Sequence, residues 1–249
     1  MKSHGKHRLS LVFVIGVVAG IIMSGAIAPD LAWAGSNNPR IAPIQSHPHG
    51  NTYGEWAAEW WQWALETPAS VNPVLDMTGE FCAEGQRGHV WFLAGTFGYG
   101  EVERECTVPS GTSLFFPLIN SFYGAFLNDS PETRTEEYIR QEVHCETPTE
   151  LVAEIDGVEV KNPFQYVEQS PLFDVQLPED NIFGVDESLV PQLLLSPSVD
   201  EGFYLFLPPL PPGEHVIHWS ASWSCPYGDF TEDATYNLTV SPGSRGREK

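Results

Sequence analysis

The residues best suited to chemistry lie in YGEWAAEWWQWALE, residues 53–66, where four tryptophans stand among acidic residues. On a helix, Trp56 and Trp63 border a stripe of carboxylates that contains Glu59. Aromatic rings beside carboxylates can bind a sugar by stacking on the pyranose and hydrogen bonding its hydroxyls. Aromatic rings also bind organic cations such as choline. One interpretation of this stretch is therefore a ligand site, such as a glycan site, at Trp56, Glu59 and Trp63.

The alternative is that these rings fill a core. At about 100° per residue, Trp56, Trp60 and Trp63 share one face of the helix, and Trp61 lies well round from them. The polar stripe is narrow and consists of Glu55, Glu59, Gln62 and Glu66. A helix that is apolar over so wide an arc is usually packed between other elements, and each tryptophan can bury roughly 150–250 Å². We expect the face of Trp56, Trp60 and Trp63 to be mostly buried.

A second candidate site lies in LFFPLINSFYGAFLND, residues 114–129. The segment begins as a buried strand, stays aromatic after Pro117, and gains polar side chains at Asn120, Asn128 and Asp129. Polar groups at the end of a buried strand can line the opening of a pocket, which makes Asn120 a candidate ligand-binding residue. The alternative is an ordinary transition from strand to loop, in which Asn and Asp form turns.

No motif of an established catalytic type is present. The chain lacks the G-x-S-x-G and H-E-x-x-H patterns. His215 and His218 are three residues apart on one predicted strand, so they point to opposite faces and cannot both bind one metal ion from that strand. The sequence therefore predicts no catalytic residue, no metal site and no cofactor.

Three kinds of function remain open. The first is a non-enzymatic binding or surface protein, with an extracellular glycan or an envelope component as its partner. The second is a secreted hydrolase that uses a pair of carboxylates about 5–10 Å apart, a distance that sequence cannot supply. The third is a structural protein of the cell envelope.

The amino terminus has the pattern of an export signal. A basic start precedes an apolar run at residues 9–28, and Ala32-Trp33-Ala34 forms an A-x-A cleavage site. We predict a signal peptide at 1–34 and an exported protein, located in the periplasm, on the cell surface or outside the cell. An uncleaved membrane anchor is the alternative, because about 20 apolar residues can span a bilayer. Residues 35–50 are rich in Pro, Ser and His, which indicates a flexible leader.

The charge of the chain excludes some partners. The formal net charge is −21, and such an acidic surface argues against binding nucleic acid or anionic membranes. It would suit the binding of cations, or simply solubility. The only membrane contact that we expect is through the signal segment, if that segment stays uncleaved.

Four cysteines in an exported chain predict two disulfides. Of the three connectivities we favour Cys82–Cys106 with Cys145–Cys225. The first pair flanks a predicted hairpin, in which HVWFLAG and EVERECTV are joined by the glycines of GTFGYG. The second pair joins the two ends of the carboxy-terminal region.

The remaining patterns define the elements. Thr52 and Glu55 match a capping box at the start of the tryptophan-rich helix, and Pro68 ends that helix. A polar surface helix is expected over 132–144. Asp156-Gly157 marks a hairpin within ELVAEIDGVEV.

Several further short strands follow, separated by turns rich in Pro and Gly. The sequence thus predicts a mainly β fold: an antiparallel sandwich, immunoglobulin-like or jelly-roll-like, with the two helices packed on it. It forms a single domain at 51–241, followed by a disordered tail at 242–249. The spacing of Asp200, Gly202 and Tyr204 is similar to the tyrosine corner of immunoglobulin-like sandwiches.

Four stretches carry a resemblance to known proteins: YGEWAAEWWQWA, GHVWFLAGTFGYGEVERECTVPSG, LFFPLIN and PPGEHVIHWSAS. Together they resemble an uncharacterised family of exported bacterial proteins, over about residues 53–240. The resemblance implies an exported, single-unit protein and carries over no catalytic residue. The carboxy-terminal third also resembles immunoglobulin-like modules of bacterial surface proteins, in which a Pro-Gly turn precedes a strand like 214–221.

Overall fold

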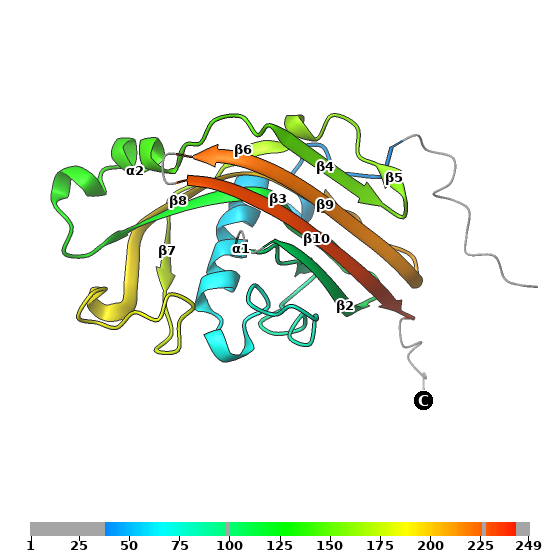
Figure 1. Cartoon of the computed structure of the whole chain (residues 1–249), viewed down its shortest axis with the longest axis horizontal. Helices are drawn as coiled ribbons and strands as arrows, with labels where there is room; N and C mark the ends of the chain where they lie inside the picture. The colour runs from blue at the N-terminus through cyan, green and yellow to red at the C-terminus, as the bar shows by residue number, and fades with distance from the viewer. Residues whose placement is uncertain (1–37, 98–99, 226–227, 243–249) are drawn as a thin grey trace, which may run out of the picture.

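The computed structural model describes residues 38–97, 100–225 and 228–242. Within these residues the chain is mainly β, with ten strands and two α-helices (Figure 1). The described chain also contains five short 3-10 helices: Pro48–Gly50, Ala69–Val71, Pro131–Arg134, Pro163–Tyr166 and Pro191–Leu193. The predicted signal peptide, 1–34, lies outside the described residues. So does the predicted tail from residue 243 onward.

The strands form two five-stranded sheets that pack as a sandwich. Sheet A has the order β1-β3-β8-β6, and β7 also pairs with β8. Its strands are β1 (Val90–Phe92), β3 (Ser113–Phe126), β6 (Val167–Gln169), β7 (Phe173–Gln176) and β8 (Leu194–Leu207). Sheet B has the order β2-β10-β9-β4-β5. Its strands are β2 (Glu101–Pro109), β4 (Glu150–Ile155), β5 (Val158–Glu159), β9 (Gly213–Cys225) and β10 (Gly228–Ser241).

Both sheets are mixed rather than purely antiparallel. Strand β1 runs parallel to β3, and β2 runs parallel to β10. The predicted hairpin of β1 with β2 is therefore wrong, because the chain passes from sheet A to sheet B between Phe92 and Glu101. The alternation in β2 made the strand itself predictable. Its partner, β10, is more than 100 residues further along the chain, and no local pattern marks that pairing.

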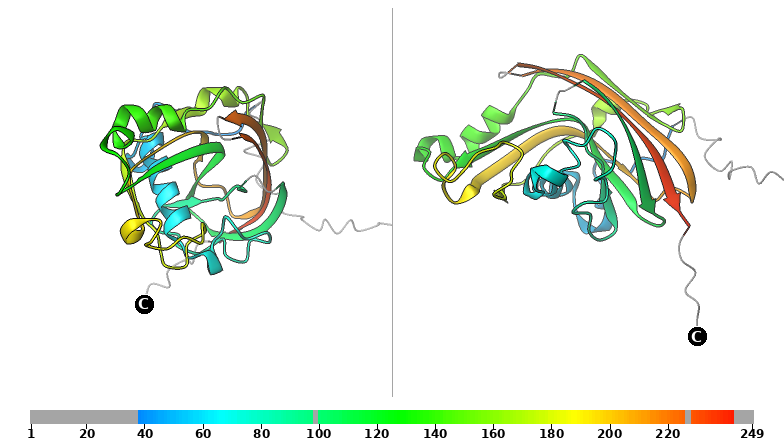
Figure 2. Two further views of the ribbon diagram at one scale, coloured as in Figure 1. Left: turned by 60° about the vertical axis from the view of Figure 1, so that its left-hand side comes forward. Right: turned by 60° about the horizontal axis from the view of Figure 1, so that its bottom comes forward.

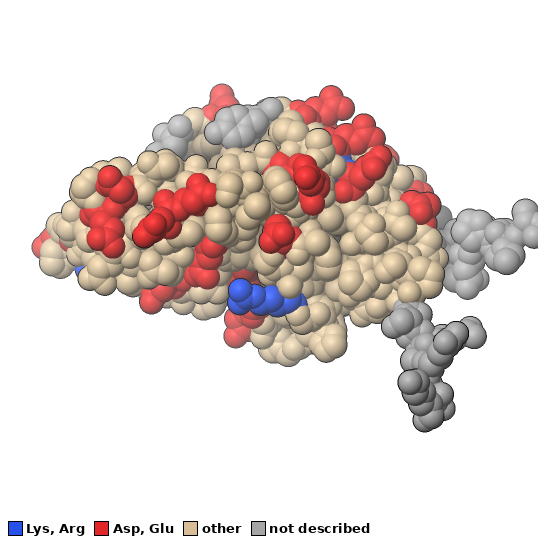
Figure 3. Space-filling model, turned by 90° about the horizontal axis from the view of Figure 1, so that it is seen from below, with Lys and Arg blue, Asp and Glu red and all other residues tan. Residues whose placement is uncertain are grey.

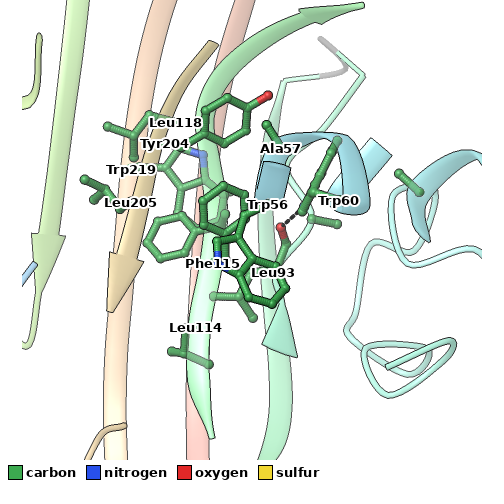
Figure 4. Close-up of a cluster of buried hydrophobic side chains, with 14 of the residues drawn as sticks. Trp56, Ala57, Trp60, Leu93, Leu114, Phe115, Leu118, Tyr204, Leu205 and Trp219 are labelled. Carbon is green, nitrogen blue, oxygen red and sulfur yellow. Dashed lines mark hydrogen bonds between the residues drawn. The ribbon is translucent and has the colours of Figure 1, made fainter. Parts of the chain in front are cut away.

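The sandwich is extended by the first helix, α1 (Tyr53–Glu66), which packs on the outer face of sheet A. Between the sheets, the rings of Phe116 and Trp219 lie 4.8 Å apart. On the other face of sheet A, the ring of Trp56 lies 6.0 Å from that of Phe206. Figure 2 shows the curved sheets and the helix beside them, and Figure 4 shows the buried side chains that join these layers.

Helix α1 has the ends and the burial that the sequence predicts. The hydroxyl of Thr52 accepts from the Glu55 amide, and the Glu55 carboxylate accepts from the Thr52 amide, which completes the capping box. The exposed fractions are 8% for Trp56, 3% for Trp60, 6% for Trp61 and 7% for Trp63. The rings are therefore chiefly core residues.

The segment before α1 is packed, although its composition predicts a flexible leader. The Ala42 amide donates to the Phe206 carbonyl, and the Ala42 carbonyl accepts from the Tyr53 hydroxyl. The side chains of Ile41, Ala42 and Ile44 lie against the core cluster. Three apolar residues in a largely polar stretch, together with these hydrogen bonds, thus hold the segment against sheet A and α1.

The other local patterns have mixed outcomes. The surface helix forms as α2 (Glu136–Val143), with Thr135 as its cap, and β4 and β5 form the predicted hairpin around Asp156 and Gly157. The tyrosine-corner interpretation is wrong. Tyr204 donates to the Asp200 carboxylate within the same strand, β8, and not to the backbone at a corner between sheets.

Both disulfides have the predicted pairing. Cys82–Cys106 joins the loop before β1 to strand β2, and Cys145–Cys225 joins the segment after α2 to the end of β9. The first pair was expected to flank a hairpin. It instead ties the loop before β1 to sheet B, where the Glu105 amide also donates to the Thr78 carbonyl.

Candidate functional site

A cavity of about 230 Å³ lies among α1, β3 and the first residues of β10. Strand β3 has 14 residues, but β1 pairs only with its first three, Ser113 to Phe115. In the same way, β2 pairs with β10 only from Asp233 onward. Strand β3 therefore continues beyond the end of β1, and β10 begins before β2. The cavity lies in the space that β1 and β2 leave open.

The wall of the cavity is largely aromatic. The rings of Trp60 and Trp61 meet edge to face at 5.1 Å, and the rings of Trp61 and Phe122 lie 4.8 Å apart. Trp60 is fixed by donating its indole N–H to the Leu93 carbonyl at 2.9 Å, drawn as a dashed line in Figure 4. The other apolar lining residues are Val74, Phe97, Pro117, Ile119, Phe183 and Phe230.

Phe183 and Phe230 are 45% and 42% exposed, although both line the cavity. Large apolar side chains that line a cavity and also reach solvent indicate where a ligand could enter. The cavity thus has an aromatic interior and an apolar entrance.

One carboxyl group, that of Glu232, lines this cavity in the described residues. It is 9% exposed and accepts a hydrogen bond from the Thr96 amide, with the Thr96 hydroxyl 3.4 Å away. Burial raises the pKa of Glu232 to about 8, although the bond from Thr96 and the charge of Arg104 act in the opposite direction. The chain passes close to this carboxyl at Gly95, where a Cβ would collide with the Glu232 carboxylate, so a larger residue there would displace that side chain.

Behind this carboxyl, a buried arginine holds the chain where it passes between the sheets. Arg104 is 1% exposed. All five of its N–H groups are hydrogen bonded to neutral acceptors, which are the carbonyls of Val74, Asp76, Ala94 and Gly95 and the hydroxyl of Tyr236. The guanidinium therefore fixes one wall of the cavity but makes no hydrogen bond to Glu232.

The predicted residue Asn120 also lines the cavity. It lies in the middle of β3, not at a strand end, because β3 continues to Phe126 along β8. Its amide donates to the Tyr204 hydroxyl at 3.1 Å, and Tyr204 donates to the Asp200 carboxyl. A buried polar chain thus leads from the cavity into sheet A.

Asp200 ends this chain and is fully buried. Burial raises its pKa to about 7, while the hydrogen bond from Tyr204 and the proximity of the polar Trp61 indole act in the opposite direction. The second carboxyl oxygen of Asp200 and the indole N–H of Trp61 make no hydrogen bond of normal geometry with the described residues. Asp200 does not line the cavity.

The other predicted site residues come together elsewhere. Trp56, Glu59 and Trp63 line a surface groove of about 390 Å³. Trp56 and Trp63 donate their indole N–H groups to the carbonyls of Pro48 and Glu84. Glu59 accepts from the side chain of Asn51, and partial burial raises its pKa. The rings are held by the protein and offer little face to the groove.

Glu232 and Arg104 were missed, although the alternation of their strands contains a signal. In β10, Glu232 is in phase with the buried residues Ala234 and Tyr236. In β2, Arg104 lies between the inward-facing Val102 and Cys106. A charged residue at an inward position requires a buried partner or a special function, whereas no local signal marks Gly95 or Phe183.

Within the described residues, no group of three or more His, Cys, Asp or Glu side chains could hold a metal ion, and none of the helices described there is long and apolar enough to cross a membrane. His215 is buried and bonded to Asp156, whereas His218 lies on the opposite face, as expected from their spacing. Comparison with models of protein families, with curated proteins and with solved structures finds no match to this chain.

Proposed function

We propose that this chain is an exported, non-enzymatic binding protein that takes a small, mainly apolar ligand into the cavity beside α1. The observation that carries the proposal is the aromatic cavity itself, with a few polar side chains in its lining: Thr96, Asn120, Ser121, Thr231 and Glu232. Binding sites for small molecules typically combine an apolar wall with a small number of polar groups that orient the ligand. The two disulfides are compatible with an oxidising, exported location.

The size of the cavity supports this choice. An engineered apolar cavity of roughly 150 Å³ binds benzene in another protein, and the cavity here is larger, at about 230 Å³. A tightly packed domain has few voids larger than a water molecule. We therefore infer that the space beside α1 is there to be filled by a ligand.

The glycan interpretation has less support. A sugar needs exposed ring faces for stacking and many hydrogen-bonding partners, but Trp56 and Trp63 are largely covered and their N–H groups are occupied. The hydrolase alternative needs two carboxyls in one site. Among the described residues, Glu232 is the one carboxylate that lines the cavity.

Titration of intrinsic fluorescence tests the proposal, because Trp60 and Trp61 line the cavity. We expect small neutral probes such as indole, benzyl alcohol and cyclohexanol to bind saturably and to raise the unfolding temperature. Thr231→Phe fills the entrance from an exposed position and should abolish binding. Thr239→Phe, on an exposed position of the same strand outside the cavity, is the matched control. Equal binding by both variants, or no binding by the unmodified protein, would refute the proposal.

A further inference from the structure

The Glu232 carboxyl makes no salt bridge in the described part of the chain. It accepts from Thr96 but takes part in no ion pair, and it faces a cavity whose remaining walls are mostly aromatic. A carboxyl group in such surroundings is costly to ionise unless an opposite charge is brought next to it. The cavity therefore contains a group that an incoming cation would stabilise.

Resting on the function proposed above, we propose that the ligand is an organic cation, an alkylated or quaternary ammonium, whose charged group lies against Glu232 and among the aromatic rings. The faces of tryptophan and phenylalanine attract cations through the ring quadrupole, and most strongly where water is excluded. Trp60, Trp61 and Phe230 supply such rings from α1 and β10. The alkyl groups of the ligand would occupy the apolar space, and Glu232 would neutralise its charge.

Arg104 does not take the place of this ligand. Its guanidinium is close enough to influence Glu232, but its five N–H groups are bonded to neutral acceptors and it does not line the cavity. Its charge also acts on Asp76, whose pKa it helps to lower. Among the described residues, the other charged group that acts on Glu232 is Asp233, which disfavours ionisation of Glu232 further and lies 3.2 Å from the His218 ring nitrogen.

The surface charge is consistent with a cationic ligand. The net charge is −21, and Figure 3 shows acidic side chains spread over one face, with few Lys and Arg among them. A negative potential raises the local concentration of cations and repels anions of similar size. An anionic ligand would meet both this potential and the Glu232 carboxyl.

Ionisation of Glu232 should make the affinity for a cationic ligand depend on pH. The pKa of Glu232 lies at about 8 in the ligand-free protein, so at neutral pH the group is mostly protonated. A permanent cation binds best when the group is ionised, so binding should release a proton. Affinity should rise with pH up to about 8, by as much as about tenfold per unit, and then level off.

The experiment compares choline with 3,3-dimethylbutan-1-ol, its neutral isostere, by calorimetry on the full exported chain between pH 6 and 9. At pH 8.5 we expect choline to bind at least about tenfold more tightly, with a pH dependence that the isostere lacks. A choline affinity no greater than that of the isostere would overturn the cation inference. Binding of the neutral probes would then still support the proposed function, and failure of every probe would remove both.

Two variants locate the effect. Glu232→Gln keeps the shape of the side chain and should lower choline affinity by about tenfold, remove its pH dependence and leave the isostere unchanged. Glu103→Gln removes the same charge from an exposed position on β2 and should change neither ligand. Retained choline preference in Glu232→Gln, with a normal unfolding temperature, would also overturn the inference.

Discussion

Asp200 is a carboxyl group buried in sheet A, and its main neighbours are the hydroxyls of Tyr204 and Ser170 and the indole of Trp61. Burial raises its pKa from 3.8 to about 7. Between these values the folded protein keeps the proton, whereas the unfolded chain loses it. Rising pH therefore favours unfolding in this window, and the stability that the protonated group contributes is complete below about pH 4 and lost by about pH 7.

We predict that Asp200→Asn makes the free energy of unfolding less dependent on pH between 4 and 7. The slope due to Asp200 is on the order of 1 kcal/mol per pH unit, and an amide has no such titration. Urea unfolding at several pH values measures the slope. Glu232, with a pKa of about 8, and His215, whose pKa is raised by Asp156, contribute in the same direction and leave a residual slope.

Asp174→Asn is the control for this variant, since Asp174 is an exposed acid on β7. It should leave the slope of the unmodified protein in place. If Asp200→Asn has the same slope as Asp174→Asn, then Asp200 is ionised in the folded protein and its burial does not set its pKa.

At the scale of single residues, the sequence could predict which side chains are candidates for a site or for the core, but not which residues they contact. Asn120 was predicted as a site residue, yet its partner Tyr204, and Asp200 to which Tyr204 donates, come from β8, a strand that pairs with β3 across about 80 residues of chain. Trp56 and Trp63 were predicted as largely buried because their angular positions on a helix are a local property. Contacts between distant strands have no such local signature.

At the scale of elements, the capping box of α1 makes a local contribution to the free energy of unfolding that can be measured. The Thr52 hydroxyl accepts from the Glu55 amide at 3.1 Å. Thr52→Ala removes this acceptor, so we expect a loss of about 1 kcal/mol in the free energy of unfolding. Thr52→Ser keeps an acceptor and should lose only a few tenths, both measured by urea unfolding. Equal losses in the two variants would show that the methyl group of Thr52, and not its hydroxyl, stabilises the helix.

The elements that were predicted correctly are those with signals inside their own sequence. Helix α1 has its cap and its wide apolar arc, and β4 with β5 has the Asp156-Gly157 turn. The hairpin of β1 with β2 was wrong because the glycines between the strands are equally compatible with a passage to the other sheet. That passage carries Gly95 past Glu232. The error in topology and the failure to find the cavity therefore have one cause.

At the scale of the whole molecule, alternation along the strands was enough to predict a mainly β sandwich. It could not give the sheet order, because the parallel pairing of β2 with β10 depends on packing between distant parts of the chain. The cavity follows from that order, since it lies where β3 continues beyond the end of β1 and where β10 begins before β2. A site of this kind is a property of topology and could not be predicted from the composition of any segment.

The two disulfides constrain the unfolded chain to different extents. The sequence separation is 24 for Cys82–Cys106 and 80 for Cys145–Cys225. Closing the longer loop removes more entropy from the unfolded state, so loop closure predicts losses of about 3.5 and about 4.5 kcal/mol when the two bonds are removed. We expect the double Cys→Ala variant at Cys145 and Cys225 to have the lower free energy of unfolding, by about 1 kcal/mol.

Urea unfolding of the two double variants measures the difference, with the oxidised unmodified protein as reference. In the folded protein the longer loop is also closed by the backbone bond from Thr149 to Ser222, at 2.9 Å, so the fold should survive without its disulfide. The entropic account concerns the unfolded state alone and predicts a fixed order of the two losses. A larger loss for Cys82 with Cys106 would contradict it. That result would show that the bond stabilises sheet B by holding β2 and the loop before β1 in the folded protein.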